Sequence, residues 1–130
     1  MRMGKVRRFV DVQRQLQRAA EWELHDLRQE EHRLAQAQQE VVAALNRDDE
    51  LTFALAPALT RRLARLATDA ETAAAAGKRQ VDVVLQHAGR LKHAERVERA
   101  LGREEERTRE KNGLSDVLDV LIGSPRAIVR

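Results

Sequence analysis

One short stretch separates two very long runs that both read as helix. Residues 46–57 open with Asn46, and the aspartates that follow also have short side chains that bond nearby backbone, which favours a helix end and a turn. Pro57 suits the first turn of a new helix, where its missing N–H would be unpaired anyway. We therefore expect the chain to reverse direction here, with the apolar residues of the stretch folded back or docked. These apolar residues are Leu51, Phe53 and Leu55.

The composition fits long helices better than a compact core. The chain has 130 residues, of which 35% are charged and only 2% are aromatic. Ala, Glu, Leu, Arg and Gln dominate, as they do in coiled coils. There is no cysteine, so disulfides and thiolate metal sites are excluded, and a reducing compartment is expected. No apolar signal region follows the basic start, and no run approaches transmembrane length, so we expect a cytoplasmic protein.

Apolar residues in the first long run, about residues 5–46, recur at steps of three and four. This spacing places them on one narrow stripe of a helix, as in a coiled-coil seam. Glu31 and Gln38 interrupt the stripe. The expected seam is Phe9, Val12, Leu16, Ala20, Leu24, Leu27, Leu34, Val41 and Leu45.

The second run, about residues 57–111, repeats the pattern. Gly77 falls on its seam after four consecutive alanines, so the helices can approach closely there. Folding the chain at about residue 52 pairs positions whose numbers sum to roughly 104, as expected for neighbouring helices joined by a short connection. The expected seam is Leu59, Leu63, Leu66, Ala70, Ala73, Val81, Val84, Ala88, Leu91, Val97 and Leu101.

Beyond about Val97 the second helix has no partner. Residues 103–111 are polar all round, and Glu105 and Arg109 can pair at i,i+4. Asn112 and Gly113 predict a helix end at about 111, followed by a short helix at about 115–122 and a flexible tail at 123–130. The prediction is thus all-α: one coiled-coil domain over residues 1–130, a long antiparallel two-helix hairpin with a turn at about 47–56 and a projecting C-terminal extension.

Catalytic and metal chemistry find little support. His25 and His32 share a helix face with Glu21, but Glu-x-x-His does not occur twice, as a di-iron bundle requires, so we read these side chains as solvated. Neither serine lies near a histidine in sequence, and no glycine-rich phosphate loop is present. A narrow two-helix rod offers no pocket. We expect no enzyme activity, cofactor, metal or small-molecule substrate.

Partner binding is the better expectation. Residues 1–20 carry six basic side chains against one acidic, a net charge of +5. Trp22 lies off the seam, either as a partly buried flank residue or as a partner anchor, since Trp is enriched in binding hot spots. The segment at 115–122 adds a small exposed apolar surface. The candidate partner-binding residues are Arg7, Arg8, Phe9, Arg14, Trp22, Val117, Leu118 and Leu121.

The whole chain resembles the FliJ-type proteins of the flagellar export apparatus and their type III secretion stalk relatives. The resemblance rests on the opening FVDVQRQL at residues 9–16, the hairpin length, the closing AERVERAL at 94–101, the charged run at 104–111, and Leu114 and Asp116. It implies a cytoplasmic coiled coil, similar to a rotary ATPase stalk, that enters the hexameric export ATPase, promotes its assembly, and helps couple it to the export-gate protein of the membrane. This chain differs from the family in being short and in its apolar end at 114–122.

Two alternatives of other classes stay open. One is a generic cytoplasmic coiled-coil scaffold or dimerisation adaptor. The other is a binder of nucleic acid or of an anionic membrane surface through the basic N-terminus. Six basic and six acidic residues balance between Glu95 and Lys111, and base-stacking aromatics are nearly absent, which argues against the nucleic-acid alternative.

Overall fold

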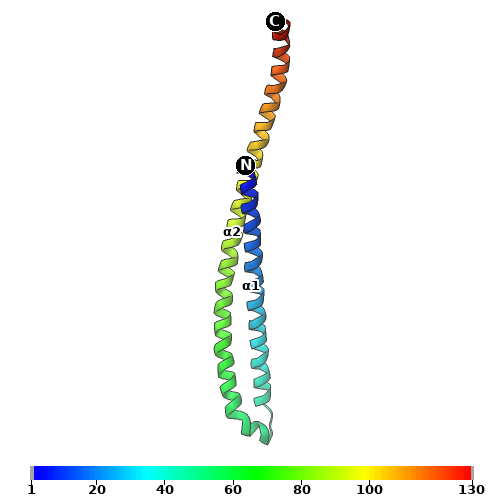
Figure 1. Cartoon of the computed structure of the whole chain (residues 1–130). Coiled ribbons are helices and arrows are strands. Elements are labelled where there is room, and N and C mark those ends of the chain that lie inside the picture. The colour runs from blue at the N-terminus through cyan, green and yellow to red at the C-terminus, as the bar shows by residue number, and fades with distance from the viewer. Residues whose placement is uncertain (1, 130) are drawn as a thin grey trace. The chain divides into compact units, whose positions relative to one another are not determined.

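Two helices make up the chain in the computed structural model, which describes the backbone of residues 2–129 and the side chains of residues 2–122. Helix α1 spans Arg2–Leu45 and helix α2 spans Glu50–Val129. They pack against each other as a helical hairpin, and the described residues contain no strand (Figure 1). The predicted all-α hairpin is confirmed.

The hairpin divides into two compact units, which we describe separately. The loop unit comprises residues 14–89, with the connection between the helices. The terminal unit comprises residues 1–13 and 90–130, with the beginning of α1 and the C-terminal part of α2.

The core of the loop unit is a thin line of apolar side chains between the helices. Leu34 and Val41 of α1 and Leu66 and Ala73 of α2 are its buried members. Partly buried residues pack around them: Ala37, Leu45, Leu59, Leu63 and Ala70. Every one of these residues except Ala37 belongs to the predicted seam, so this part of the sequence prediction is confirmed.

Polar side chains also enter the seam. Gln80 is buried, and its Nε2 donates a hydrogen bond of 2.9 Å to the carbonyl oxygen of Ala20 on α1. Gly77 is buried as well, and the Glu31 carboxylate fills the space where a Cβ at position 77 would lie. A side chain at position 77 would displace the flexible end of Glu31, whereas no backbone atom of α1 occupies that space.

The predicted pairing register agrees with the contacts between the helices. In the loop unit, Gln80 bonds Ala20 and Glu31 covers Gly77, pairs whose numbers sum to 100 and 108. In the terminal unit, the Met3 side chain lies over Gly102, a pair that sums to 105. These values bracket the predicted sum of about 104, which places Leu59 opposite Leu45. Because α1 ends at Leu45, the residues of α2 before Leu59 have no partner on α1.

The predicted seam is wrong at the beginning of α1. Val10 and Gln13 are buried, whereas Phe9, Val12 and Leu16 are at least 40% exposed. The buried line of α1, followed back from Leu34 to Met3 in alternating steps of three and four residues, passes through positions 17, 13, 10 and 6. The regular spacing is therefore maintained, although positions 17 and 13 of this line are glutamines. The adjacent line, with more apolar residues, faces solvent.

The α2 seam needs a smaller correction of the same kind. Gln80 and Ala94 are buried, and Val97, predicted to be in the seam, is 37% exposed.

Three buried polar atoms have no hydrogen-bond partner among the described residues: Gln13 Oε1, Gln17 Oε1 and His87 Nδ1. Such atoms lower the stability of a seam compared with apolar packing.

The connection between the helices is shorter than predicted. It comprises only residues 46–49, in place of the predicted turn at 47–56, because Asp49 caps α2. Its Oδ1 accepts a hydrogen bond of 2.6 Å from the Thr52 N–H, which pairs one of the free donors at the helix start. Hydrogen bonds from Thr52 also lower the pKa of the Asp49 carboxyl.

Pro57 therefore lies inside α2, as its eighth residue, and not at its start. Figure 1 shows α2 changing direction within its first turns, as expected where proline cannot donate to the preceding turn. The prediction that Leu51, Phe53 and Leu55 fold back is wrong, because these residues are 69%, 84% and 46% exposed. They precede Leu59, so α1 has nothing opposite them to cover them.

The predicted helix end at Asn112–Gly113 is also wrong. Helix α2 continues through Val129, with no separate short helix at 115–122. The backbone is helical over residues 123–129 of the expected tail at 123–130, and Arg130 lies outside the described residues. No described glycine has a positive φ, so Gly113 does not form a left-handed cap. Good helix formers on both sides outweigh one glycine, and the predicted ion pair between Arg109 and Glu105 forms at 3.9 Å. The side chains of residues 123–130 lie outside the described set.

Replacing Gly113 with alanine tests this correction. A Cβ at position 113 meets no atom within 4 Å, and alanine favours a helix interior over glycine by about 1 kcal/mol. We expect higher helicity by circular dichroism at 222 nm and slower amide hydrogen exchange over residues 106–122. Gly89→Ala is the matched control, since position 89 is also open. A loss of helicity in Gly113→Ala alone would show that Gly113 caps a helix.

Candidate partner-binding surfaces

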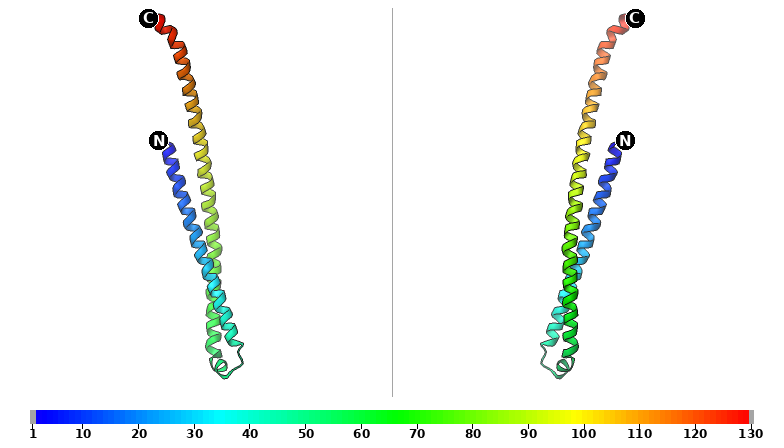
Figure 2. Two further views of the ribbon diagram at one scale, coloured as in Figure 1. Left: turned by 90° about the vertical axis from the view of Figure 1, so that its right-hand side faces the viewer. Right: turned by 90° about the vertical axis from the view of Figure 1, so that its left-hand side faces the viewer.

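The C-terminal part of α2 carries an exposed apolar stripe, which we call the terminal stripe: Leu114, Val117, Leu118 and Leu121. These residues are spaced at i, i+3, i+4 and i+7, which places them on one face, and each is more than half exposed. Within the terminal unit, α2 continues past the start of α1, so no residue of α1 lies opposite the stripe (Figure 2). The structure thus groups the predicted residues Val117, Leu118 and Leu121 and adds Leu114.

The terminal stripe does not continue the hairpin seam. The seam spacing, carried on from Leu101, reaches Glu105 and then four more polar positions before Ile122, namely Thr108, Asn112, Ser115 and Asp119. The stripe lies on a neighbouring line of the helix. An apolar line on a face different from the intramolecular seam is a separate surface, of the kind that marks a protein interaction site.

A second surface is an open groove between the helices of the terminal unit, which we call the terminal groove. Its lining residues are Lys5, Val6, Phe9, His93, Ala94 and Val97. Half of the Phe9 side chain is exposed, and Arg7 and Arg8 are exposed beside it. Of the predicted basic residues, Arg7 and Arg8 therefore accompany Phe9, whereas Arg14 belongs to the loop unit.

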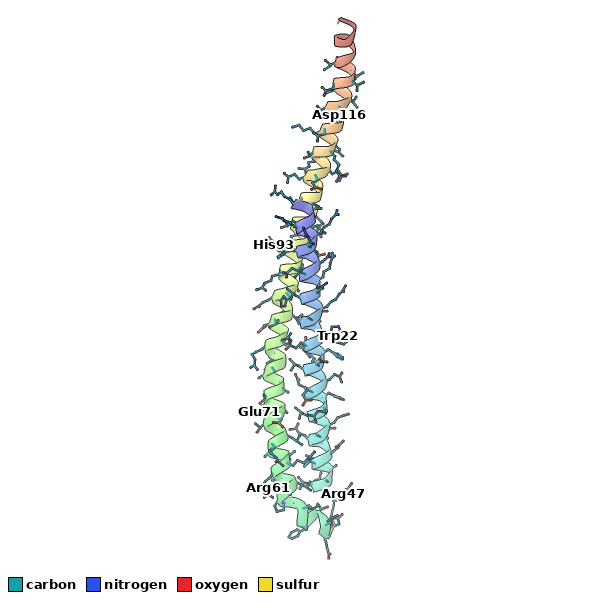
Figure 3. The ribbon with its side chains drawn as sticks, viewed as in Figure 1. Trp22, Arg47, Arg61, Glu71, His93 and Asp116 are labelled. Carbon is teal, nitrogen blue, oxygen red and sulfur yellow. The ribbon has the colours of Figure 1, made fainter. Side chains whose placement is uncertain are left out.

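Trp22 lies in the loop unit, two-thirds exposed, and Figure 3 shows its side chain projecting away from α2. Its indole meets the His25 ring edge-on, with centroids 5.9 Å apart and an interplanar angle of 87°. Arg18 and Glu21 complete a shallow depression around this pair on α1. The high exposure of Trp22 fits an available anchor better than a partly buried flank residue.

A third exposed surface was not recognised as a binding candidate from the sequence. We call it the loop tip: residues 48–55, with Leu51, Phe53 and Leu55 exposed. Asp48, Asp49 and Glu50 directly precede the apolar residues. The apolar residues are visible in the sequence, but apolar residues in an expected turn favour a docked turn over an exposed one.

Two other kinds of site are absent from the described residues. No group of three or more histidine, aspartate or glutamate side chains could hold a metal ion there. Neither helix, over its described length, contains a segment apolar enough to cross a membrane. No family model matches the chain, and no curated protein or solved structure matches it either.

Proposed function

We propose that this chain is a non-enzymatic stalk or escort component of a flagellar or type III protein export apparatus. It would act in the cytoplasm, at the inner face of the membrane through its partners. Its partners would be the hexameric export ATPase, whose assembly and activity it promotes, and the export-gate protein. The observation that carries the proposal is the end of α2, which lies beyond α1 and exposes the terminal stripe.

The terminal stripe supplies the attraction that such a stalk needs. Full burial of a leucine or valine side chain contributes about 1.5–3 kcal/mol, so burying the exposed halves of four such residues contributes roughly 3–6 kcal/mol to docking. Association itself costs about 4–15 kcal/mol, so further contacts must add to this gain. A single helix is also slender enough to enter a ring. No catalytic or cofactor role is required of any residue in this arrangement.

The basic start of α1 supplies a second contribution in the same unit. Arg7 and Arg8 are exposed, and residues 1–13 carry four basic side chains against Asp11. Charges at the rim of an interface raise the association rate and set orientation more than they raise affinity. Acidic loops on the ATPase ring are the surface that this charge fits.

The test uses the cognate export ATPase and the full chain. We expect Leu118→Ser combined with Leu121→Ser to raise the concentration for half-maximal ATPase stimulation by about tenfold or more, which corresponds to the loss of about 1.4 kcal/mol. Deleting residues 114–130 should abolish stimulation. Arg7→Glu with Arg8→Glu should weaken it and reduce its salt dependence. Circular dichroism should show the hairpin intact in each case.

Leu85→Ser is the matched control for the apolar changes, because Leu85 is 63% exposed and lies in the loop unit. Arg61→Glu with Arg62→Glu is the control for the charge changes. Equal stimulation by the intact, truncated and reversed chains would exclude the proposal. The scaffold alternative instead expects no effect on any ATPase.

A further inference from the structure

The loop tip displays the most exposed large apolar side chain of the described residues. Phe53 is 84% exposed, and Leu51, at 69%, lies close to it in sequence. Leu51 and Leu55 are four residues apart, so they share a face of the first turns of α2. Holding a phenylalanine and two leucines in water on an ordered, capped helix start is unfavourable unless another surface covers them.

The charge around these side chains indicates the chemistry of that surface. Asp48, Asp49 and Glu50 are consecutive carboxylates, and with Arg47 they give this region a net charge of −2 on a chain of net charge +3. Arg47 extends from the connection in Figure 3. The hydrogen bonds from Thr52 lower the pKa of the Asp49 carboxyl. The matching surface is therefore apolar with a basic rim.

The terminal groove has these properties. Val6, Phe9, Ala94 and Val97 make its apolar wall, and Lys5 places a cation at its edge. Residues 1–13 carry a net charge of +3. The groove offers about 520 Å³, which is enough space for an aromatic and an aliphatic side chain.

We propose that the loop tip of one copy of this chain docks into the terminal groove of a second copy. Phe53 inserts between Phe9 and Val97, where offset or edge-on packing of the two rings adds to the burial of apolar area. The carboxylates of the tip face Lys5 and the neighbouring arginines. Each copy displays both surfaces, so the contact is heterologous and links one copy to the next, and it does not depend on the proposed export function.

The contact is small, so it belongs to the weak and transient class of interfaces. Sedimentation equilibrium of the full chain, from about 10 µM to about 1 mM, covers that class. We expect the weight-average mass to rise with concentration at about 0.05 M salt and to rise much less at about 0.5 M, because salt screens exposed charges. Phe53→Ser should lower the association constant by about tenfold or more. Leu85→Ser should leave it unchanged.

Variants with reversed charge test directly whether the loop tip contacts the terminal groove. Asp48→Lys with Glu50→Lys reverses the tip, and Lys5→Glu reverses the edge of the groove. Either variant alone should associate less than the natural chain. A mixture of the two should regain association, because the unchanged tip of the Lys5→Glu chain then meets the unchanged groove of the Asp48→Lys, Glu50→Lys chain. Circular dichroism should confirm that every variant retains the helicity of the natural chain.

Three results would overturn the proposal. The first is a constant monomer mass at all concentrations and both salt levels. The second is self-association that persists unchanged in Phe53→Ser. The third is self-association lost in Leu118→Ser but not in the tip variants, which would place the contact between copies on the terminal stripe.

Discussion

An aspartate in place of Val10 is expected to destabilise the terminal unit by about 3–5 kcal/mol, the cost of an uncompensated charge in a buried position. Val10 is the only large side chain of the described residues that is fully buried, with 0% exposure. The register places it opposite Ala94, which is 2% exposed. Urea unfolding followed at 222 nm and hydrogen exchange of residues 3–13 measure the effect.

Val12→Asp is the matched control, since it introduces the same carboxylate two residues away. Val12 is 50% exposed, so we expect a change within about 0.5 kcal/mol. This pair of variants separates the two possible seams of α1. Equal destabilisation by both variants, or a larger loss of stability in Val12→Asp, would show that the buried seam is the line predicted from the apolar pattern.

Leu34→Ala is expected to lower the stability of the loop unit by about 2–4 kcal/mol, from lost burial and from the cavity left behind. Leu34 is 3% exposed and lies in the cluster with Val41, Leu66 and Ala73. The whole core of this unit is one line of side chains, so a missing leucine has few neighbours that can fill the space. Thermal and urea unfolding of the full chain measure the change.

Leu85→Ala removes the same atoms from an exposed position, and we expect it to alter stability by no more than about 0.5 kcal/mol. If the two alanine variants unfolded at the same urea concentration, Leu34 would not be in the core. The difference between the two changes in unfolding free energy therefore shows how much more a leucine stabilises the chain in the seam than on the surface.

The hairpin and most of its core follow from local rules in the sequence. Steps of three and four identify the seam correctly from Ala20 to Leu45 and from Leu59 to Ala73, where apolar residues occupy nearly every position of the line. One cluster of turn-forming residues places the reversal. The register follows from the reversal, because a short connection leaves little freedom in which residues face each other.

The errors arise where a local preference and a wider constraint disagree. At the beginning of α1, the line of residues that maintains constant spacing is buried, although it includes Gln13, and the more apolar line is exposed. At Gly113, the local signal for a cap lost to the helix propensity of its neighbours. Helix propensity and hydrophobicity are properties of single residues, whereas the packing of two helices determines which whole line of residues along each helix is buried.

The candidate surfaces were predictable to different degrees. The apolar residues at 117–121 could be identified because nothing in the hairpin is long enough to cover them. Phe9 of the terminal groove was predicted as a binding candidate, but an open groove was not, because the sequence pattern assigned both Phe9 and Val97 to the seam. The loop tip required knowing that the helix begins at Glu50, which depends on one cap by Asp49.

The contact of Glu31 with Gly77 bears on whether one helix can slide along the other. Sliding by one heptad in either direction would bring the Glu31 carboxylate against Ala70 or Val84, whose side chains occupy the space that Gly77 leaves open. The hydrogen bond from Gln80 cannot prevent such slippage by itself, because every residue of α1 offers a backbone carbonyl. The missing side chain of Gly77 thus makes one alignment distinct from its neighbours, because only in that alignment does the flexible Glu31 carboxylate fit against α2 without turning away.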